Sequence, residues 1–328
     1  MIKVGINGFG RIGRLILRAL FENYKGKIKI VGINDLGSVE ANAHLIKYDS
    51  THGTLNHDIK TTKEGFQIGD QDIKVFAEKD PANLPWGKIG ADVVLECTGF
   101  FLDKKSAGKH IEAGAKKVII SAPAKEVDFT VVQGVNSIDL KKEHNIISNG
   151  SCTTNCLAPL AYLLENSVGI ESGYMTTVHS VTGDQNTIDT IHKDLRRARN
   201  SLISIIPTST GAARAVGEVL PQLKGKIDGS AIRVPTSNVS LVDFKFLSKR
   251  ETNEEELIMI FKNAEDGILK SILETTSEPL VSPDFNQNPH SSIVDLSEIK
   301  VLNQKFCRVL SWYDNEWGFS NRMCDIAE

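Results

Sequence analysis

The stretch Ile2-Lys3-Val4-Gly5-Ile6-Asn7-Gly8-Phe9-Gly10-Arg11-Ile12-Gly13 opens the chain and decides the fold of its first half. Its first six residues predict a short buried strand, and residues 14–21 carry apolar side chains at helical spacing. A second strand is predicted over residues 28–33 and ends at Asn34-Asp35. Gly-x-Gly-x-x-Gly between a strand and a helix is typical of a dinucleotide-binding βαβ unit.

Each residue of this motif has a predicted task. Gly8 would form the turn, Gly10 would let a pyrophosphate approach the backbone, and Gly13 would let helix and strand pack closely. Asp35 would accept hydrogen bonds from ribose hydroxyls and repel a 2′-phosphate, which favours NAD. The alternative is an ordinary glycine-rich loop, and the complete strand, turn, helix, strand and acid order argues against it.

More apolar segments continue this pattern towards the middle of the chain. Strands are predicted over residues 74–76, 92–97, 117–121, 131–135 and 146–148, with a helix over 103–113. Strands that are apolar throughout and alternate with helices indicate a doubly wound parallel sheet. Thr98-Gly99 and Ser121 end two of the strands, where ligands of such sheets bind, although either could be an ordinary loop residue.

The sheet leads to Ser151-Cys152-Thr153-Thr154-Asn155-Cys156, followed by an apolar helix over residues 157–165. Cap-forming residues surround Cys152, so we expect it at a helix N-terminus with a lowered thiol pKa and nucleophilic character. The alternative, a small buried hydrophobic residue, suits Cys156 better.

Composition narrows the class of protein. A chain of 328 residues predicts two domains, and 41% hydrophobic with 24% charged residues is ordinary for a globular enzyme. A net charge of −3 does not support nucleic-acid or anionic-membrane binding. The apolar runs are too short to span a membrane, and a strand begins almost at the first residue, without a leader. Five cysteines without disulfide or zinc spacing indicate a reducing cytoplasm and no metal site.

The second half has a different pattern. Strands are predicted over residues 171–181, 231–235, 239–247, 291–295 and 306–313, with a helix over 254–272, which indicates an α+β domain with a mixed, largely antiparallel sheet. His179 ends the first of these strands, and we interpret it as the base that a catalytic thiol requires, the alternative being a surface or structural histidine. Residues 206–213 resemble an anion site at a helix N-terminus. The basic run 192–199 is either a solvated face, a subunit contact or part of such a site.

These motifs together resemble the phosphorylating glyceraldehyde-3-phosphate dehydrogenases of type I along essentially the whole chain. The matching stretches are residues 7–14, 47–53, 151–159, 192–199, 206–216, 233–236 and 311–316. The resemblance implies a homotetramer in which residues 1–150 form a Rossmann domain, residues 151–314 form the catalytic domain, and a C-terminal helix over 315–328 packs back onto the Rossmann domain. It also implies oxidation of glyceraldehyde 3-phosphate to 1,3-bisphosphoglycerate in glycolysis or gluconeogenesis.

The resemblance further assigns roles to single residues. Cys152 matches the family's nucleophile, which forms a hemithioacetal and then a thioester, and His179 matches its general base. Thr182, Asp184 and Arg233 match the site of the substrate phosphate, whereas the site of the attacking inorganic phosphate is matched by Ser151, Thr153, Arg197, Thr210 and Gly211. The cofactor residues by this match are Arg11 and Ile12 at the pyrophosphate, Asp35 at the ribose, Lys79 near adenine, Ser121 at the nicotinamide half and Asn315 at the carboxamide.

Some positions depart from the family pattern. Thr190-Ile191 replaces the Leu-Pro usual in NAD-preferring members, so NADP stays an alternative to the NAD that Asp35 favours. Val181 and Gly183 replace the usual Tyr and Asn beside Thr182. Glu328 ends the chain about ten residues before a common family terminus.

Three other functions compete with this interpretation. The first is the sister activity on erythrose 4-phosphate, which shares the architecture. The second is a Cys-His acyltransferase or hydrolase with a vestigial nucleotide fold, against which the Gly8, Gly10, Gly13 and Asp35 set argues. The third is RNA binding through the dinucleotide groove, which a net charge of −3 does not support.

Overall fold

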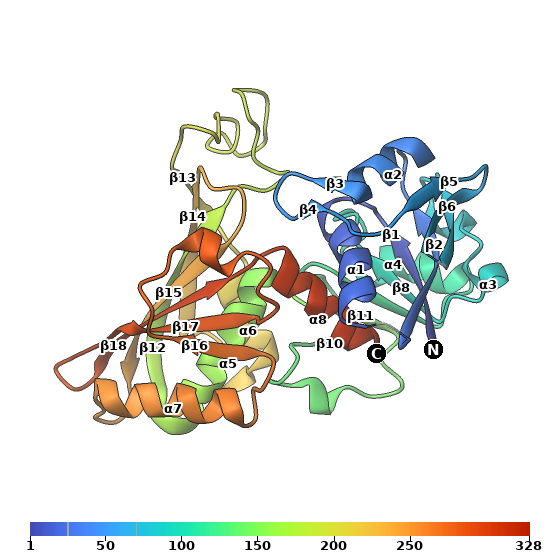
Figure 1. Ribbon diagram of the computed structural model, residues 1–328. Helices are drawn as coiled ribbons and strands as arrows, with labels where there is room; N and C mark the ends of the chain where they lie inside the picture. The colour runs from blue at the N-terminus through green and yellow to red at the C-terminus, as the bar shows by residue number, and fades with distance from the viewer. Residues whose placement is uncertain (25, 70) are drawn as a thin grey trace. The chain divides into compact units, whose positions relative to one another are not determined.

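The computed structural model describes residues 1–24, 26–69 and 71–328, which form two compact units (Figure 1). Unit 1 comprises Met1–Val131, Asp139–Gly150 and Phe319–Glu328. Unit 2 comprises Val132–Ile138 and Ser151–Gly318. Among the described residues, no helix is both long and apolar enough to cross a membrane.

Unit 1 is built on a sheet in the order β10-β11-β9-β8-β1-β2-β7-β6-β5. The strands from β10 to β7 pair in parallel, and β6 and β5 add an antiparallel edge. The strands are β1 (Ile2–Asn7), β2 (Ile28–Asn34), β5 (Ile59–Thr61), β6 (Gly65–Ile68), β7 (Gln71–Phe76), β8 (Val93–Glu96), β9 (Lys117–Ile120), β10 (Phe129–Thr130) and β11 (Ile146–Ser148). The helices are α1 (Arg11–Glu22), α2 (Val39–Lys47), α3 (Trp86–Ile89) and α4 (Lys104–Glu112), and β3 (Tyr48–Asp49) pairs with β4 (Gly53–Thr54). This is the predicted doubly wound arrangement.

The last helix, α8 (Trp317–Ala327), belongs to unit 1 from Phe319 onward. The amide of Asn23, just after α1, donates to Asn321 Oδ1 at 2.8 Å. The hydroxyl of Tyr24 donates to the Asn321 carbonyl at 3.1 Å and also to Asp325. The two ends of the chain are therefore joined within one unit.

Unit 2 is built on a sheet in the order β13-β14-β12-β15-β18-β17-β16. Its strands are β12 (Ile170–Ser180), β13 (Ile206–Ser209), β14 (Ile227–Val234), β15 (Ser240–Ser248), β16 (Leu273–Thr276), β17 (Ser292–Leu302) and β18 (Phe306–Tyr313). β12 pairs in parallel with β14, and β16 with β17, while the other neighbours are antiparallel. Helices α5 (Cys152–Ser167), α6 (Ala212–Val219) and α7 (Glu254–Asp266) pack on this sheet (Figure 1).

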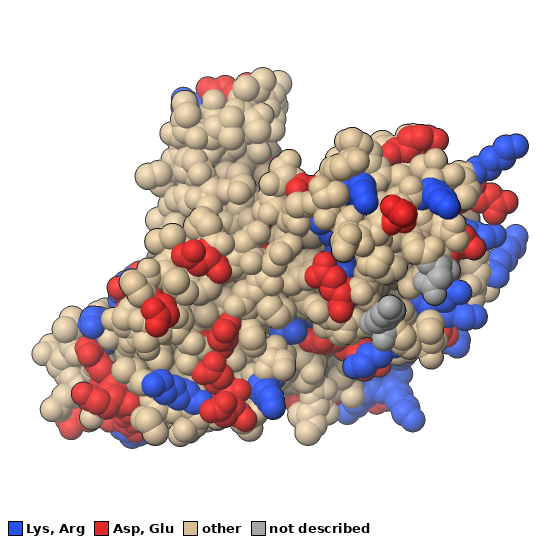
Figure 2. Space-filling model, in the orientation of Figure 1, with Lys and Arg blue, Asp and Glu red and all other residues tan. Residues whose placement is uncertain are grey.

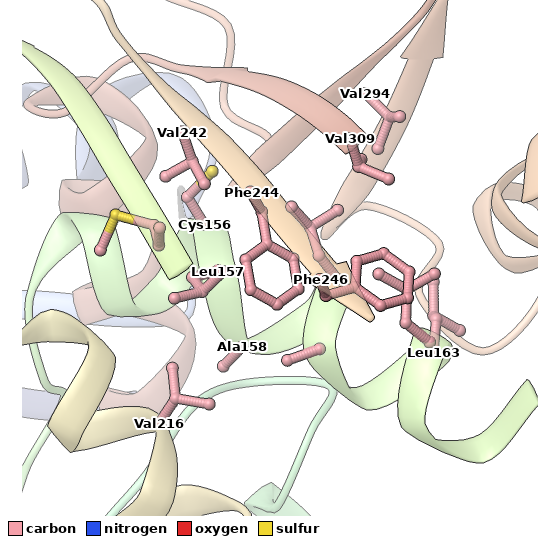
Figure 3. Packing of buried hydrophobic residues seen from close by; sticks show 14 of the residues in the cluster. Cys156, Leu157, Ala158, Leu163, Val216, Val242, Phe244, Phe246, Val294 and Val309 are labelled. Atoms are coloured by element: carbon pink, nitrogen blue, oxygen red, sulfur yellow. The ribbon is translucent and has the colours of Figure 1, made fainter. Parts of the chain in front are cut away.

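The core of unit 2 lies between α5 and the sheet (Figure 3). β15 alternates buried and half-buried residues, as a strand with one face on the core should, and Phe244 and Phe246 point from it towards α5. On α5, Leu157 and Leu163 face these rings and are buried, and Val216 closes the core from α6. This packing fixes the axis of α5, and with it the position of the residue at its first turn.

Two predicted elements are wrong. Residues 131–135 were expected to form a sheet strand, but β10 ends at Thr130. Beyond it, the backbone N–H groups of Val135 and Asn136 both donate to the Val132 carbonyl, which makes a turn. The helix expected over 254–272 ends at Asp266, because Gly267 provides its C-cap and the apolar residues after it continue as turns.

Candidate functional site

The glycine turn of unit 1 borders a cavity of about 480 Å³ at the carboxyl ends of β1, β2 and β8. Gly8 has a φ of +91°, and a Cβ there would lie 2.7 Å from the Thr98 nitrogen. A Cβ on Gly13 would lie 2.2 Å from the Gly8 carbonyl oxygen, whereas Gly10 faces open space. The motif therefore gives a tight turn, close helix packing and an open approach to the backbone, as a dinucleotide requires.

The polar groups of this cavity also fit a dinucleotide. Gly10 caps α1 without a side-chain hydrogen bond within the described residues, so the first N–H groups of the helix can face a pyrophosphate. Asp35 lines the cavity, and its carboxylate accepts the N–H groups of Phe9 and Gly37, each at 2.9 Å. Lys79 lines the same cavity from the loop after β7.

Two other predicted cofactor residues, Arg11 and Ser121, are engaged with protein groups. The Arg11 guanidinium is paired with Asp49; burial raises the pKa of that carboxyl, but hydrogen bonds from Arg11 and the backbone N–H groups of His52 and Thr51 lower it to about 2. Arg11 would thus meet a phosphate through its backbone at the start of α1, beside Ile12. Ser121 follows β9 and donates its N–H to the Glu96 carbonyl, while Thr98 lines the cavity itself.

A buried polar network that the sequence did not reveal supports the cavity. Glu96, at the end of β8, accepts from the Asn7 amide at 2.6 Å and from the Thr98 N–H at 2.8 Å, and its Oε2 lies 2.9 Å from His110 Nε2. The Trp86 indole N–H donates to His110 Nδ1 at 2.9 Å, so the proton of the neutral ring lies on Nε2 and points at Glu96. Through the hydrogen bond from the Thr98 N–H to Glu96, this network holds the Thr98 backbone at the cavity.

In unit 2, the structure brings Cys152 and His179 together. Ser151 is the N-cap of α5, and its Oγ accepts the Thr154 N–H at 3.0 Å, so Cys152 is the first residue of the helix. His179 lies near the end of β12 and is buried, with Nε2 3.6 Å from Cys152 Sγ. A thiol and a base within proton-transfer reach are the two groups needed for nucleophilic catalysis.

The ionisation of this pair differs from the expectation. Burial raises the pKa of the Cys152 thiol, although the charge of Arg233 and hydrogen bonds with Thr153 oppose it. The predicted lowering of this pKa is therefore wrong, because burial outweighs the helix terminus and the nearby cation. Burial and then the charge of Arg233 lower the pKa of His179 to about 3, against a hydrogen bond with Ser180 that raises it. At neutral pH the pair is a thiol facing a neutral imidazole.

Arg233 contacts the second nitrogen of this histidine. It is the register partner of His179 where β14 runs beside β12, and its Nη1 lies 2.7 Å from His179 Nδ1. Nη1 also donates to the Ser180 carbonyl at 2.8 Å, the same oxygen that lies 2.8 Å from Nδ1. Arg233 Nε is buried and has no hydrogen-bond partner among the described residues, which leaves a donor for an anion.

A tyrosine missed by the sequence analysis ties these elements together. The Tyr313 hydroxyl lies 2.8 Å from Thr153 Oγ1 on α5 and 2.9 Å from Thr177 Oγ1 on β12. Its ring meets the His179 ring edge-on, with centroids 5.9 Å apart. Thr153, a predicted phosphate residue, therefore directs its hydroxyl to the protein interior and keeps its backbone N–H at the helix terminus.

Three of the predicted anion-binding residues, Thr182, Asp184 and Arg197, are connected by hydrogen bonds through Gln185 and Asp184. Arg197 is paired with Asp184, and its Nε donates to Thr208 Oγ1 at 2.9 Å, a hydroxyl that the sequence analysis had not selected. Burial raises the pKa of Asp184, but the hydrogen bond and charge of Arg197 lower it, so the carboxylate is ionised. Thr182 bonds to Gln185 Oε1 through its N–H, at 2.9 Å.

The remaining predicted residues lie at element ends. Gly211 is the N-cap of α6, and Thr210 Oγ1 accepts the Ala212 N–H at 3.2 Å. Asn315 follows β18, and its Oδ1 accepts hydrogen bonds from the Ser180 and Ser240 hydroxyls. Within the described ranges, no group of three His, Cys, Asp or Glu residues is arranged to hold a metal ion.

Comparison with known proteins agrees with this geometry. Residues 2–104 match the family model described as glyceraldehyde 3-phosphate dehydrogenase, NAD binding domain, and residues 151–315 match the C-terminal domain of the same family. The chain is 55% identical over 326 residues to a glyceraldehyde-3-phosphate dehydrogenase of Xanthobacter flavus, covering 99% of this chain and 97% of the relative. A Zymomonas mobilis enzyme of that name is 57% identical over 328 residues, with 99% and 97% covered. Glyceraldehyde-3-phosphate dehydrogenase 1 of Bacillus subtilis is 52% identical over 327 residues, again with 99% and 97% covered.

Proposed function

Since this chain belongs to the glyceraldehyde 3-phosphate dehydrogenase family, we propose that it oxidises glyceraldehyde 3-phosphate with NAD and inorganic phosphate to form 1,3-bisphosphoglycerate. The family matches confirm the predicted enzyme class, the NAD cofactor and the Rossmann and α+β fold. The observation that carries the reaction is Cys152 Sγ at the first residue of α5, 3.6 Å from His179 Nε2.

The cofactor would be held in the cavity of unit 1. The turn of Gly8, Gly10 and Gly13 and the first N–H groups of α1 would bind its pyrophosphate, and Asp35 its ribose. When bound, NAD accepts the hydride that the aldehyde carbon loses. The Asp35 carboxylate would repel the negative charge of a 2′-phosphate, which favours NAD over NADP.

The first chemical step is addition of Cys152 to the aldehyde. Because the thiol is protonated and His179 is neutral, Nε2 takes the thiol proton as Sγ attacks the carbonyl carbon. This transfer requires the ring proton on Nδ1, donated to the Ser180 carbonyl, so that the Nε2 lone pair faces Sγ. Arg233 Nη1, 2.7 Å from Nδ1, then directs its N–H to the same carbonyl oxygen. Return of the proton to the oxyanion gives a neutral hemithioacetal.

The second step converts this hemithioacetal into a thioester. His179 takes the hydroxyl proton while the hydride departs from the same carbon, and the C=O bond re-forms. An imidazolium beside Arg233 is disfavoured, so His179 readily gives up this proton again. Inorganic phosphate then attacks the thioester carbonyl, and Cys152 leaves as the thiolate.

Two arginines support the recognition of phosphate groups. Arg233, with its unpartnered buried Nε, and Arg197, beside Thr208, can each donate hydrogen bonds to a phosphate oxygen. We assign the substrate phosphate to Arg233 with Thr182 and Asp184. The attacking phosphate is assigned to Arg197 with Ser151, Thr153, Thr210 and Gly211. Arg197 must exchange its contact with Asp184 for a phosphate oxygen when that anion binds.

We also propose a homotetramer. The segment between β12 and β13 exposes several apolar side chains, among them Ile191 at 99%, Ile203 at 82% and Leu195 at 81% exposure. Below its tip, the side of this segment visible in Figure 2 carries few charged residues. An apolar surface of this kind favours contact with another copy of the chain.

The cytoplasm is the proposed compartment. All five cysteines lie among the described residues and are free thiols, and Cys152 must stay reduced to react.

A direct assay tests the function. Reduced-nicotinamide absorbance would be followed with glyceraldehyde 3-phosphate and phosphate, separately with NAD and NADP. We expect rapid, phosphate-dependent reduction of NAD, and its loss in Cys152→Ser while NAD binding is retained. Normal turnover of that variant would refute the mechanism. Preference for NADP would mean that Thr190-Ile191 outweighs Asp35, and greater activity with erythrose 4-phosphate would refute the proposed substrate.

A further inference from the structure

The amide oxygen of Asn315 is held by two buried hydroxyl groups. Ser180 Oγ lies 2.9 Å and Ser240 Oγ 2.8 Å from Asn315 Oδ1. Ser180 ends β12, directly after His179, and Ser240 begins β15. All three side chains are buried, with Ser180 at 0%, Ser240 at 2% and Asn315 at 4% exposure.

Counting protons determines which way the amide faces. Ser240 Oγ accepts the Ser180 backbone N–H at 3.0 Å, so its own proton is available to donate. Among the described residues, Asn315 Oδ1 is the one acceptor within hydrogen-bond distance of either hydroxyl. Turning the amide over would leave both hydroxyl protons buried without an acceptor, which is costly. The amide oxygen is therefore committed to the serines.

The Asn315 nitrogen is consequently the atom left for a ligand. Asn315 Nδ2 has no protein acceptor among the described residues and carries two N–H donors. Asn315 held in this way can bind a hydrogen-bond acceptor and cannot bind a donor.

We propose that Ser180 and Ser240 are positioning residues that fix Asn315 as an N–H donor to the carbonyl oxygen of the nicotinamide carboxamide. This inference rests on the proposed NAD-dependent function, in which the family match assigns Asn315 to the carboxamide. Ser180 thereby serves two groups: its carbonyl contacts His179 and Arg233, and its hydroxyl orients Asn315. Substituting its side chain leaves the carbonyl in place, so the two contributions can be separated.

The test is NAD binding by titration calorimetry. Replacing both serines with alanine (S180A/S240A) frees the amide to turn, and we expect NAD to bind about tenfold more weakly, as for loss of one good hydrogen bond. The single variant Ser240→Thr keeps Ser180 and retains a hydroxyl at position 240. It should bind NAD within about threefold of the unmodified protein. The alkylation rate of Cys152 without NAD should stay unchanged, because the Ser180 carbonyl is retained.

Ser292 and Ser311 supply the matched control. Their hydroxyls are also buried, lie on neighbouring strands and bond to each other at 2.8 Å, but they do not contact Asn315. The S292A/S311A variant removes the same atoms from the same unit, and we expect unchanged NAD affinity. An equal loss of affinity in this control would mean that the serines act only through stability, and would overturn the proposal.

An analogue tests the donor assignment without any substitution. The 3-acetylpyridine analogue of NAD keeps the carbonyl oxygen and lacks the amide N–H groups. If Asn315 is a donor, the analogue should bind the unmodified protein within about threefold of NAD. Loss of the analogue's affinity by tenfold or more would mean that the protein requires the carboxamide N–H as a donor, and would refute the inference.

The variant Asn315→Ala separates the role of Asn315 in NAD binding from its positioning by the two serines. If Asn315→Ala binds NAD normally, the role of Asn315 in the proposed function is wrong. If Asn315→Ala weakens NAD binding but S180A/S240A does not, Asn315 keeps its role and the positioning by the serines is refuted.

Discussion

Cys152 is a partly buried thiol beside a neutral imidazole, and this determines how it should react with alkylating agents. Because burial raises its pKa above the ordinary 9.0, we expect the rate of carboxamidomethylation to keep rising with pH up to and beyond pH 9. Iodoacetamide labelling of Cys152, followed by peptide mass spectrometry across a pH series, measures this. Cys156, buried on the same helix, is the internal control and should label far more slowly. A plateau below pH 7 would instead indicate a preformed thiolate–imidazolium pair.

His179 gives a second prediction at the same scale. Its pKa of about 3 means that the base is neutral above that pH and is lost only when acid protonates it. The rate of the hydride step should therefore show no acidic limb near pH 6.5, where an ordinary histidine titrates. His179→Gln should slow that step by about 10²–10⁴-fold. Single-turnover rates over pH 4.5–9 test both points, and a limb at pH 6–7 that disappears in the variant would contradict the first.

Single residues also show where sequence reasoning reaches its limit. Cys152 and His179 were predictable because each has a local signal, a cap-rich turn and a strand end. Tyr313, Thr208 and Ser240 were not selected, because each acts through a partner on another segment of the chain, and a hydroxyl in a strand has no local signature. The predicted lowering of the Cys152 thiol pKa was wrong for the same reason, because burial depends on what packs around the helix end.

At the scale of elements, the packing of β15 against α5 should dominate the stability of unit 2. Phe244 is fully buried in that core, so Phe244→Ala should cost about 3–5 kcal/mol of unfolding free energy. Urea unfolding followed by circular dichroism measures the change. Phe306, on β18 and 46% exposed, is the matched aromatic control and should cost about 1 kcal/mol or less when changed to alanine. Equal costs would show that the core does not limit stability.

Hydrophobic pattern predicted most elements, and it failed where a backbone conformation overrides it. Residues 131–135, with three β-branched valines, look like a strand, but Gly134 has a φ of +79° and the Asn136 side chain accepts the Val132 N–H, which closes a turn. After Asp266 the apolar spacing continues, yet Gly267 ends α7. Apolar side chains are buried equally well in a turn, so the pattern alone could not distinguish the two.

At the scale of the whole molecule, the exposed segment between β12 and β13 carries the prediction of assembly. Ile191→Asp combined with Ile203→Asp places two charges on this apolar surface and should shift the proposed tetramer towards smaller species. Light scattering coupled to size exclusion measures the mass. Ile138→Asp is the control, since Ile138 is 92% exposed outside the segment and its substitution should change nothing. A doubly substituted protein that remains tetrameric would refute this interface.

The closure of unit 1 by the last helix has a consequence for biosynthesis. Met1–Val131 is synthesised before unit 2, yet Asn321 and Asp325, which bond to Asn23 and Tyr24, are synthesised only after unit 2. Unit 2 comes entirely from residues between these two parts, so every residue of unit 2 has been synthesised before unit 1 can close. The unit that is synthesised first is therefore completed last, and a chain lacking Phe319–Glu328 would carry all residues of the catalytic unit and an unfinished Rossmann unit.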